Sequence, residues 1–346
     1  MRNGREGICG GSIAWVNLTY FCPLRCPWCY AVQADDGHFM DRSTLNEILY
    51  FLEDFGTHRL MLSGGEPTLH PDFLGMVYLC QHRNFKVMLN TSGLAFADPY
   101  FLGRAVDNGL SFVNLSLKGV NGRDFMANTG VDGFWEQRSA VENMSKDKRL
   151  TLTINLTLNR YFMSNFDQAL DLLREWGVNA VSVDLARPVD GPDPYGGGSI
   201  PTEEEAAEFV IDCISKLAGG DMNYIFRLDV PLCRFAKSNV ADRIKQLNFM
   251  TNCFMRDGNV VVFDPIGQVV PCNILTGNVL GRIGKDFSTA REYDRFLRRE
   301  DVAQKMKTLL ADDSEECSSC PLAYKCCRGC AAFKFHKALD VVVPAI

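Results

Sequence analysis

The sequence predicts an α/β fold built from parallel βα units. From about residue 12 to residue 185, short runs rich in Val, Ile and Leu alternate with longer amphipathic runs. Short apolar strands separated by helices are typical of parallel sheets, which are covered on both faces. Such units close into barrels or form open, doubly wound sheets. Functional residues in both architectures lie at the carboxyl ends of the strands, and two motifs of chemical character directly follow the first two predicted strands.

The apolar runs are predicted as strands and the amphipathic runs between them as helices. The predicted strands cover Ile13–Thr19, Arg59–Leu62, Lys86–Asn90, Phe112–Leu117, Thr151–Leu158 and Ala180–Leu185. The predicted helices cover Leu45–Phe55, Pro71–Arg83, Pro99–Asn108, Phe134–Asp147 and Asn165–Trp176.

The character of the chain changes after the sixth strand. Residues 187–201 are dense in Pro and Gly and are predicted to form a loop. A helix is predicted at Thr202–Leu217, because its acidic start suits the positive end of the helix dipole. Beyond Met250 the apolar runs are shorter, and cysteines dominate as far as Cys330. The predicted domains are 1–230, with its core at 12–185 and a linker and helix at 187–230, and a cysteine-rich domain at 231–346.

Composition limits the class of protein. The 346 residues are 47% hydrophobic and 23% charged, a normal globular balance. The net charge of −6 argues against nucleic-acid binding, which favours a basic surface. The polar N-terminus has no apolar signal segment, and no run approaches 18 apolar residues, so neither export nor membrane insertion is expected. Fourteen cysteines without export therefore indicate metal or redox chemistry in a reducing cytoplasm.

The most informative motif follows the first strand. Cys22, Cys26 and Cys29 form a C-x3-C-x2-C pattern, with Trp28 directly before the last thiol. Four-iron clusters are usually held by four cysteine thiolates, so three local ligands leave one iron open. The alternative is half of a structural zinc site. The spacing resembles the signature of the radical S-adenosylmethionine (SAM) enzymes, which implies a partial (β/α)6 barrel of the TIM type and an open iron chelated by the amino and carboxylate groups of SAM.

The second motif, Ser63-Gly64-Gly65-Glu66-Pro67, follows the second strand. Two glycines allow a close approach of the backbone to a ligand, and a carboxylate can accept hydrogen bonds from an ammonium group. A tight turn before the next helix is the alternative. At this position the segment resembles the GGE motif of the radical SAM family, which binds the SAM amino group. Asn90 and Thr91 after the third strand could reach a ribose or cap a helix.

Further site residues are expected at later strands. In similar enzymes a serine and an arginine placed like Ser116 and Arg138 bind the SAM carboxylate, a task that suits a guanidinium; a surface arginine is the alternative for Arg138. Lys118 departs from the family's usual SLDG sequence and suggests an anionic group on the substrate. Asp184, near the end of the sixth strand, is a candidate proton acceptor or a structural carboxylate.

The C-terminal cysteines form the second strong pattern. Cys253-x13-Gly267-x4-Cys272 is followed by Cys317-x2-Cys320-x5-Cys326-x3-Cys330. This spacing resembles six of the seven cysteines of the SPASM domain, the auxiliary-cluster module of radical SAM maturases, with a zinc ribbon as the alternative. The resemblance assigns Cys253, Cys272 and Cys330 to auxiliary cluster I, and Cys317, Cys320 and Cys326 to auxiliary cluster II. Each set lacks one thiolate. Cys233, Cys327, a non-cysteine residue or substrate could complete a set, or only one auxiliary cluster forms.

The remaining cysteines, Cys9, Cys80 and Cys213, have no ligand spacing, and the latter two are expected in helix cores. Some SPASM maturases carry an aspartate as base directly after the second cysteine of the set. Here that position is Asn273, which argues against serine-oxidising sulfatase maturation.

The resemblance implies a radical SAM oxidoreductase. SAM would be cleaved reductively to a 5′-deoxyadenosyl radical that abstracts hydrogen from a C–H bond, and auxiliary [4Fe–4S] clusters would accept the electron. The expected substrate is a peptide in ribosomal natural-product (RiPP) maturation, undergoing crosslinking or oxidation. The alternative is dehydrogenation, epimerisation or decarboxylation of a sugar, nucleoside or aminoglycoside. Expected partners are a flavodoxin- or ferredoxin-type reductant and, because the first strand begins near residue 12, a separate leader-binding protein. A non-enzymatic electron carrier or zinc-stabilised binding protein would explain the cysteines but not the motifs after strands two and four.

Overall fold

The structure is a computed structural model that describes most of the chain. The described residues are 13–188, 199–217, 222–227, 229–235, 249–250, 253, 255, 258, 260–310, 317, 319–320, 326 and 329–333.

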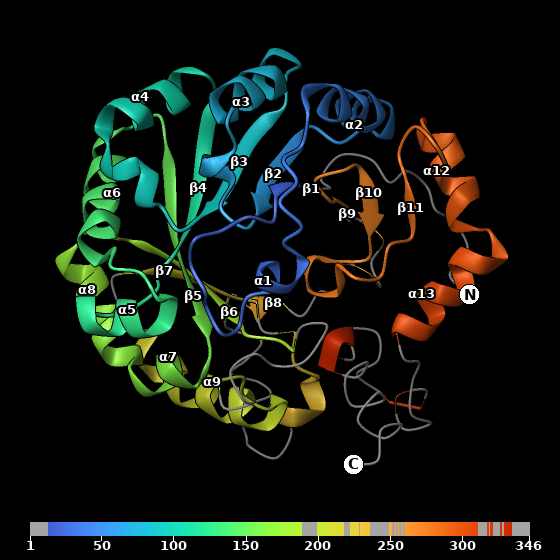
Figure 1. Ribbon diagram of the computed structural model, residues 1–346. Helices are drawn as coiled ribbons and strands as arrows, with labels where there is room; N and C mark the ends of the chain where they lie inside the picture. Colours follow the sequence, from blue (N-terminus) through green and yellow to red (C-terminus); the bar gives the residue numbers. More distant parts are fainter. Residues whose placement is uncertain are drawn as a thin grey trace.

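Six parallel strands form the centre of the molecule. They are β1 (Ile13–Thr19), β2 (Arg59–Gly64), β3 (Lys86–Thr91), β4 (Leu110–Ser116), β5 (Thr151–Leu158) and β6 (Ala180–Leu185). They pair side by side in chain order, and the sheet curves around a central space with helices outside it (Figure 1). β1 and β6 do not pair with each other, so the barrel is partial. The six predicted strands are confirmed, three of them with the predicted bounds.

Helices cover the outer face of these strands. The predicted ones are present as α2 (Arg42–Phe55), α3 (Phe73–His82), α4 (Pro99–Asp107), α6 (Phe134–Lys146), α8 (Phe166–Glu175) and α9 (Glu203–Leu217). Side-chain caps explain some of the boundaries: Asp41 accepts from the Thr44 N–H at the start of α2, and Gly56 ends that helix in the left-handed conformation. The sequence did not predict α1 (Ala31–Ala34), α5 (Gly122–Thr129) and α7 (Arg160–Ser164), which are too short to show a helical period.

The sheet continues beyond both ends of the partial barrel. β7 (Asn223–Arg227) and β8 (Phe249–Met250) extend it past β6, whereas β9 (Val260–Phe263) pairs with β1 on the other side. β10 (Gln268–Val270) and β11 (Gly281–Arg282) follow β9 in antiparallel order. The strand that leads into Cys22 is therefore flanked by β2 and by a strand from the C-terminal third. The division at residue 230 stays a prediction, since one sheet includes strands from both sides of it.

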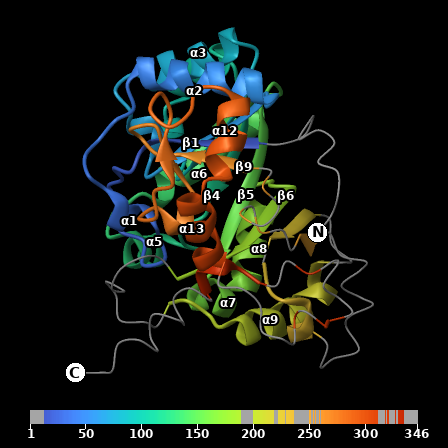
Figure 2. The same cartoon turned by 90° about the vertical axis from the view of Figure 1, so that its right-hand side faces the viewer.

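Aromatic packing joins the C-terminal third to the barrel. The Phe51 ring of α2 lies 5.9 Å from Phe263, 5.2 Å from Phe287 and 5.4 Å from Tyr293, measured between ring centroids. Tyr293 belongs to α12 (Ala290–Leu297), and α13 (Glu300–Leu310) follows it. Figures 1 and 2 both place α12 beside α2. Burial of this cluster fixes β9 and β10 against the first βα unit.

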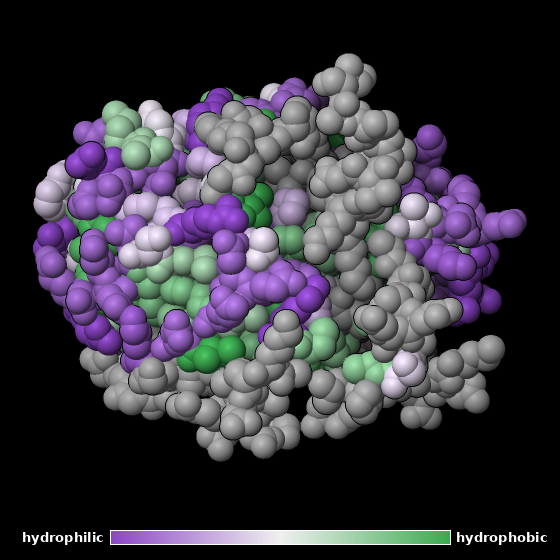
Figure 3. Space-filling view, turned by 90° about the horizontal axis from the view of Figure 1, so that it is seen from below, coloured by the Kyte–Doolittle hydropathy of each residue, from purple (hydrophilic) through white to green (hydrophobic). Residues whose placement is uncertain are grey.

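Apolar side chains reach the surface in one area and at scattered positions (Figure 3). Figure 3, seen from below, shows a hydrophobic area framed by hydrophilic residues. The most exposed large apolar side chains, Tyr100, Trp135 and Tyr50, lie on three different helices, and scattered residues of this kind are normal. Among the described helices, none combines the length and the apolar character needed to cross a membrane.

The turn between β9 and β10 yields a prediction about stability. Asp264 is 7% exposed, and its Oδ1 accepts from the Ile266 and Gln268 N–H groups at 3.0 and 2.7 Å. Burial raises its pKa from the usual value near 3.8 to about 6. The folded state therefore holds the proton more tightly than the unfolded state, and this carboxyl lowers stability as the pH rises from about 4 to about 6.

Asp264→Asn keeps an oxygen for both N–H groups and removes the charge. We expect the variant to gain up to about 3 kcal/mol over the wild type at pH 7 and little at pH 4. The midpoints of anaerobic urea unfolding of both proteins, compared from pH 4 to pH 8, measure this difference. A difference that does not change with pH would contradict the assignment.

Candidate functional site

A cavity of about 300 Å³ lies at the carboxyl ends of the strands. It brings together residues that the sequence spreads over more than 300 positions. The sequence-predicted residues on its wall are Cys22, Cys26, Trp28, Cys29, Ser63, Gly64, Gly65, Glu66, Asn90, Thr91, Ser116, Asp184, Cys253, Cys272 and Cys330. Lys118 and Asn273 also line it. The sequence-predicted site residues that do not line it are Arg138, Cys233, Cys317, Cys320 and Cys326.

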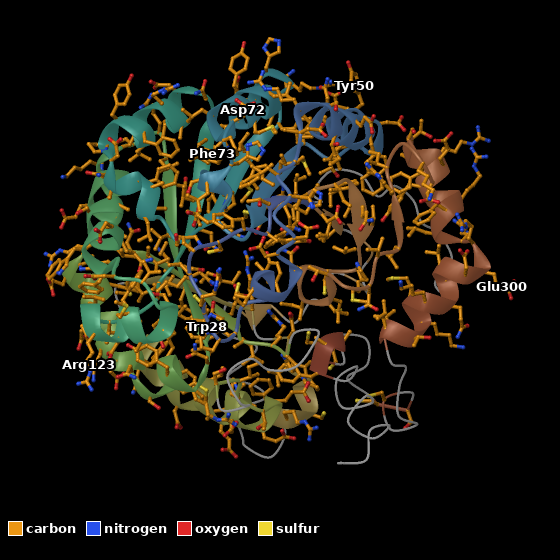
Figure 4. All side chains as sticks on the ribbon, viewed as in Figure 1. Trp28, Tyr50, Asp72, Phe73, Arg123 and Glu300 are labelled. Carbon is orange, nitrogen blue, oxygen red and sulfur yellow. The ribbon has the colours of Figure 1, made fainter. Side chains whose placement is uncertain are left out.

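The first set of thiols lies in the loop after β1. The Cys29 N–H donates to the Cys26 carbonyl at 3.1 Å, and the Arg25 N–H donates to the Thr129 carbonyl at 2.8 Å, so the loop is closed and fixed to the end of α5. Burial raises the pKa of Cys22 to about 12 and also raises that of Cys26. Trp28, 8% exposed, lies inside the molecule, whereas Arg123 and Glu300 lie at its periphery (Figure 4). Two buried thiols and one half-buried thiol on one short loop fit a four-iron cluster with an open iron.

The two glycines of the second motif pack against the cysteine loop. A Cβ on Gly64 would lie 2.0 Å from the Thr19 carbonyl oxygen, and one on Gly65 would lie 2.3 Å from the carbonyl oxygens of Tyr20 and Phe21. The Gly65 N–H donates to the Thr19 carbonyl at 2.8 Å. The close approach expected toward a ligand is therefore, in this structure, an approach of one motif to the other.

Glu66 connects the ends of two strands. Its Oε1 accepts from the N–H and hydroxyl of Thr68 at 3.2 and 2.7 Å and from the Thr91 hydroxyl at 2.7 Å. Its Oε2 accepts from the N–H and hydroxyl of Ser92 at 2.8 and 2.6 Å. The carboxylate is 4% exposed and holds the end of β2 to the end of β3. Its role toward a SAM ammonium stays a prediction.

Asparagines on neighbouring strands line the cavity between the two motifs and β6. Asn114 donates to Asn90 Oδ1 at 3.0 Å, and the buried Asn114 Oδ1 accepts from none of the described residues. Asn155 lies opposite Ser116 in the register of β4 and β5. Asn114 and Asn155 were not predicted as site residues from the sequence. Each interrupts an apolar strand with one amide, and that signal could have identified them.

Arg138 does not reach the cavity. Its guanidinium pairs with Glu142 at 3.1 Å and Glu175 at 3.4 Å and lies over the Trp135 ring at 5.7 Å. The preceding residue, Gln137, points to the strands instead, and its amide donates to the carbonyls of Ser92 and Ser116 at 2.7 and 3.0 Å. Lys118 is the cation on the wall near the first thiols, where its charge partly offsets the rise in the Cys26 pKa that burial causes.

A group of charged side chains lines the end of the cavity near β6 and β7. Burial raises the pKa of Asp184, and nearby Arg187 and Arg227 lower it in part. The Asn155 amide, with its nitrogen turned toward Asp184, donates to the carboxylate at 2.9 Å. Arg187 pairs with Asp229 at 2.7 Å. Arg227 lies opposite Asp184 in register, and its buried Nε has no partner among the described residues.

The second set of thiols meets this charged group. Burial raises the pKa of Cys272 to about 12 and that of Cys330 to about 11, and Cys253 lies within electrostatic range of both. The Arg187 charge partly offsets the rise at Cys330. Asn17 of β1 donates to Asn273 Oδ1 at 3.0 Å, which fixes the segment after Cys272 to the barrel. The structure thus brings together the three cysteines that the resemblance assigned to cluster I.

The thiols of these sets do not converge on one point. Within the described ranges, no three Cys, His, Asp or Glu side chains are arranged as ligands of a single metal ion. The four thiolates of a [4Fe–4S] cluster bind four separate irons. Cys80 and Cys213 are buried in α3 and α9, as expected of core residues. Cys9 and Cys327 lie outside the described residues.

Relatives are found by sequence. The sequence model of the radical SAM superfamily matches residues 16–147. The PqqA peptide cyclase of Rhizobium meliloti (strain 1021) is 29% identical over 157 residues, which are 45% of this chain and 42% of the cyclase. The GTP 3′,8-cyclase of Pasteurella multocida (strain Pm70) is 27% identical over 180 residues, 49% of this chain and 52% of the relative. The chain spans about half the length of the curated relatives that it matches.

Similar structures cover more of the chain. The structure of anSMEcpe with bound AdoMet and the Cp18Cys peptide has a TM-score of 0.67 at 17% identity, over 92% of this chain and 89% of that chain. Streptococcus suis SuiB bound to the precursor peptide SuiA has a TM-score of 0.67 at 16% identity, over 92% and 71%. These likenesses show a shared fold. The match of the superfamily's sequence model identifies residues 16–147 as a radical SAM domain, the kind of domain that uses a [4Fe–4S] cluster and SAM.

Proposed function

We propose that this protein oxidises or crosslinks a peptide by radical SAM chemistry, with a [4Fe–4S] cluster held by Cys22, Cys26 and Cys29. One observation carries the proposal: a single cavity joins this cysteine loop to a second set of thiols, Cys253, Cys272 and Cys330. When bound, SAM and the reduced cluster supply a 5′-deoxyadenosyl radical that removes hydrogen from a C–H bond. A substrate in this cavity would lie between the two sets of cysteines.

In this proposal, residues of the chain bind and orient SAM and exclude water from the cavity. Ser63, Asn90, Thr91 and Ser116, at the ends of β2 to β4, are proposed to bind SAM beside the first cluster. Trp28 closes the wall with an apolar surface. Buried amides and hydroxyls at strand ends are suited to this role, because they are held by the sheet before the ligand arrives.

The charged end of the cavity suits the second half of an oxidation. After a hydrogen atom leaves the substrate, the loss of one proton and one electron completes a two-electron oxidation. Asp184 is proposed to accept the proton, since its buried carboxyl has a raised pKa and is oriented by Asn155. Cys253, Cys272 and Cys330 would hold the auxiliary cluster that accepts the electron. The buried Nε of Arg227, which has no partner among the described residues, favours a substrate with an anionic group nearby.

The peptide substrate is supported by two kinds of relative. The PqqA cyclase is named for a peptide substrate, and the anSMEcpe and SuiB structures contain peptides. The related GTP 3′,8-cyclases support a second candidate, a small-molecule substrate of the nucleotide class. The Arg227 guanidinium suits phosphate as well as carboxylate.

The test is SAM cleavage by the anaerobically reconstituted, reduced protein, followed as 5′-deoxyadenosine. We expect cleavage in the wild type and none in Cys26→Ala. Adding short peptides that begin or end in acidic residues is expected to stimulate cleavage and to yield a product two mass units lighter. GTP is the comparison probe. Stimulation and conversion of GTP alone would replace the peptide proposal by the second candidate, and no cleavage under any condition would contradict radical SAM chemistry.

The cation that binds the SAM carboxylate gives a further prediction. Lys118 lies on the cavity wall near Cys26, whereas Arg138 pairs with two glutamates outside it. We expect Lys118→Met to raise the KM for SAM about tenfold, the value of one charge-assisted hydrogen bond. The matched variant Arg138→Met is expected to leave this KM unchanged. Equal effects of both variants would contradict the placement of Arg138.

A further inference from the structure

Four cysteines gather outside the cavity, beside α9. Three of them, Cys317, Cys320 and Cys326, are half-buried and belong to the set that the resemblance assigned to cluster II. The fourth, Cys233, is exposed and lies in η3 (Leu232–Phe235), a short 3-10 helix after β7. The Cys233 thiol lies within electrostatic range of the Cys326 and Cys317 sulfurs.

A hydrogen bond joins the two segments directly. The Leu232 N–H donates to Cys326 Sγ at 3.3 Å, across 94 residues of sequence. Hydrogen bonds from backbone N–H groups to cysteine sulfurs are a feature of iron–sulfur sites, where they adjust the reduction potential. Because Leu232 directly precedes Cys233, this bond sets the position of Cys233 relative to Cys326.

Packing around η3 independently fixes the same arrangement. A Cβ on Gly329 would lie 2.8 Å from Pro231 Cγ, so the chain just before Cys330 lies against the start of η3. On the other side, Arg234 pairs with Glu204 of α9 at 2.8 Å. The buried Phe235 anchors the end of the helix. The Cys233 segment is therefore held between α9 and the last cysteines of the chain.

We propose that Cys233 is the fourth ligand of the second auxiliary cluster, together with Cys317, Cys320 and Cys326. The inference rests on the proposed function, because it assumes that this set holds a [4Fe–4S] cluster. Three of these thiols leave one iron without a protein ligand, and Cys233 supplies the missing thiolate from a segment far away in the sequence. A cluster with four protein thiolates has no open iron for substrate, so the second auxiliary cluster would carry electrons only.

The test uses the full chain in a background that lacks the first cluster, Cys22/Cys26/Cys29→Ala, so that only auxiliary clusters contribute. Iron and sulfide content, the EPR spectrum of the reduced protein and the reduction potentials are measured after anaerobic reconstitution. We expect Cys233→Ala to lose about four of about eight irons and one of two EPR signals. Cys233→Ser, which offers an oxygen ligand of similar size, is expected to keep the iron with a shifted signal and potential.

Two control variants make the result specific. Cys213→Ala removes a buried thiol of α9, and Cys327→Ala removes the neighbour of Cys326; both are expected to keep iron content and spectra unchanged. If Cys233→Ala kept the iron content, spectrum and potentials of the background variant, the proposal would be overturned, as it would by loss of the same cluster in Cys327→Ala instead. If the background variant itself holds no iron, the auxiliary clusters of the proposed function fail as well; if it holds about eight irons and Cys233→Ala changes nothing, only the ligand assignment fails.

Discussion

Replacing Cys22, Cys26 and Cys29 together by alanine is expected to remove about four irons per chain and all SAM cleavage. The three thiols lie on one loop at the end of β1; Cys22 and Cys26 are 9% and 4% exposed, and Cys29 is half-buried. Once the thiols are removed, neither water nor surface side chains can replace them as ligands of the cluster. Iron and sulfide content, with Mössbauer spectra of anaerobically reconstituted protein, measures the loss.

The iron content of the wild-type protein identifies the number of auxiliary clusters. With two of them, the iron content is expected to fall from about twelve to about eight; with one, from about eight to about four. The matched control is Cys80→Ala, which removes a fully buried thiol of α3 that does not line the cavity. It is expected to lower stability and to leave the iron count unchanged. A triple variant that keeps all its iron would contradict the central assignment of this protein.

The strands and main helices could be predicted because their sequences carry strong local patterns. β1, β5 and β6 have the predicted bounds, since each is a short run that contains several Val, Ile or Leu residues and no Gly or Pro. The strands after residue 222 could not be predicted in the same way. β8 and β11 have two residues each, which is too short for any periodicity. Their pairing depends on contacts with β7 and β10.

In the candidate site, too, residues with a local sequence pattern could be predicted, and residues that only the fold brings together could not. The cysteine and glycine motifs are identified by the spacing of their residues along the chain. The residues on both sides of the cavity could therefore be predicted from the sequence. The direction of a helical side chain is harder to predict, because one residue turns it by about 100°. That turn separates Gln137, which contacts the strand ends, from Arg138, which pairs with glutamates outside. The group around Arg187, Arg227 and Asp229 was missed because only the fold brings β6 and β7 beside Cys330.

The glycines of the second motif show how one residue can serve both fold and site. The sequence predicts that they make room for a ligand, which stays a prediction, and the structure shows that they also make room for the cysteine loop. Backbone atoms cannot move aside as the end of a long side chain can. Space at Gly65 is therefore a condition for the position of Cys22, two residues after Tyr20.

Gly65→Ala is expected to lower the free energy of unfolding by about 3 kcal/mol and to reduce the iron of the first cluster selectively. The new Cβ would lie 2.3 Å from two carbonyl oxygens, those of Tyr20 and Phe21, and something must shift. The side that can shift is the loop that carries Cys22. Anaerobic urea unfolding and iron content measure the two effects.

Gly103→Ala is the matched control for Gly65→Ala. Gly103 lies inside α4, and a Cβ there would meet no atom within 4 Å. Because alanine is the better helix former, this variant is expected to gain about 0.5–1 kcal/mol with unchanged iron. If Gly65→Ala were as stable as Gly103→Ala and kept its full iron content, the loop after β1 would not depend on the glycine motif. The motif would then act on a ligand, as the sequence alone suggested.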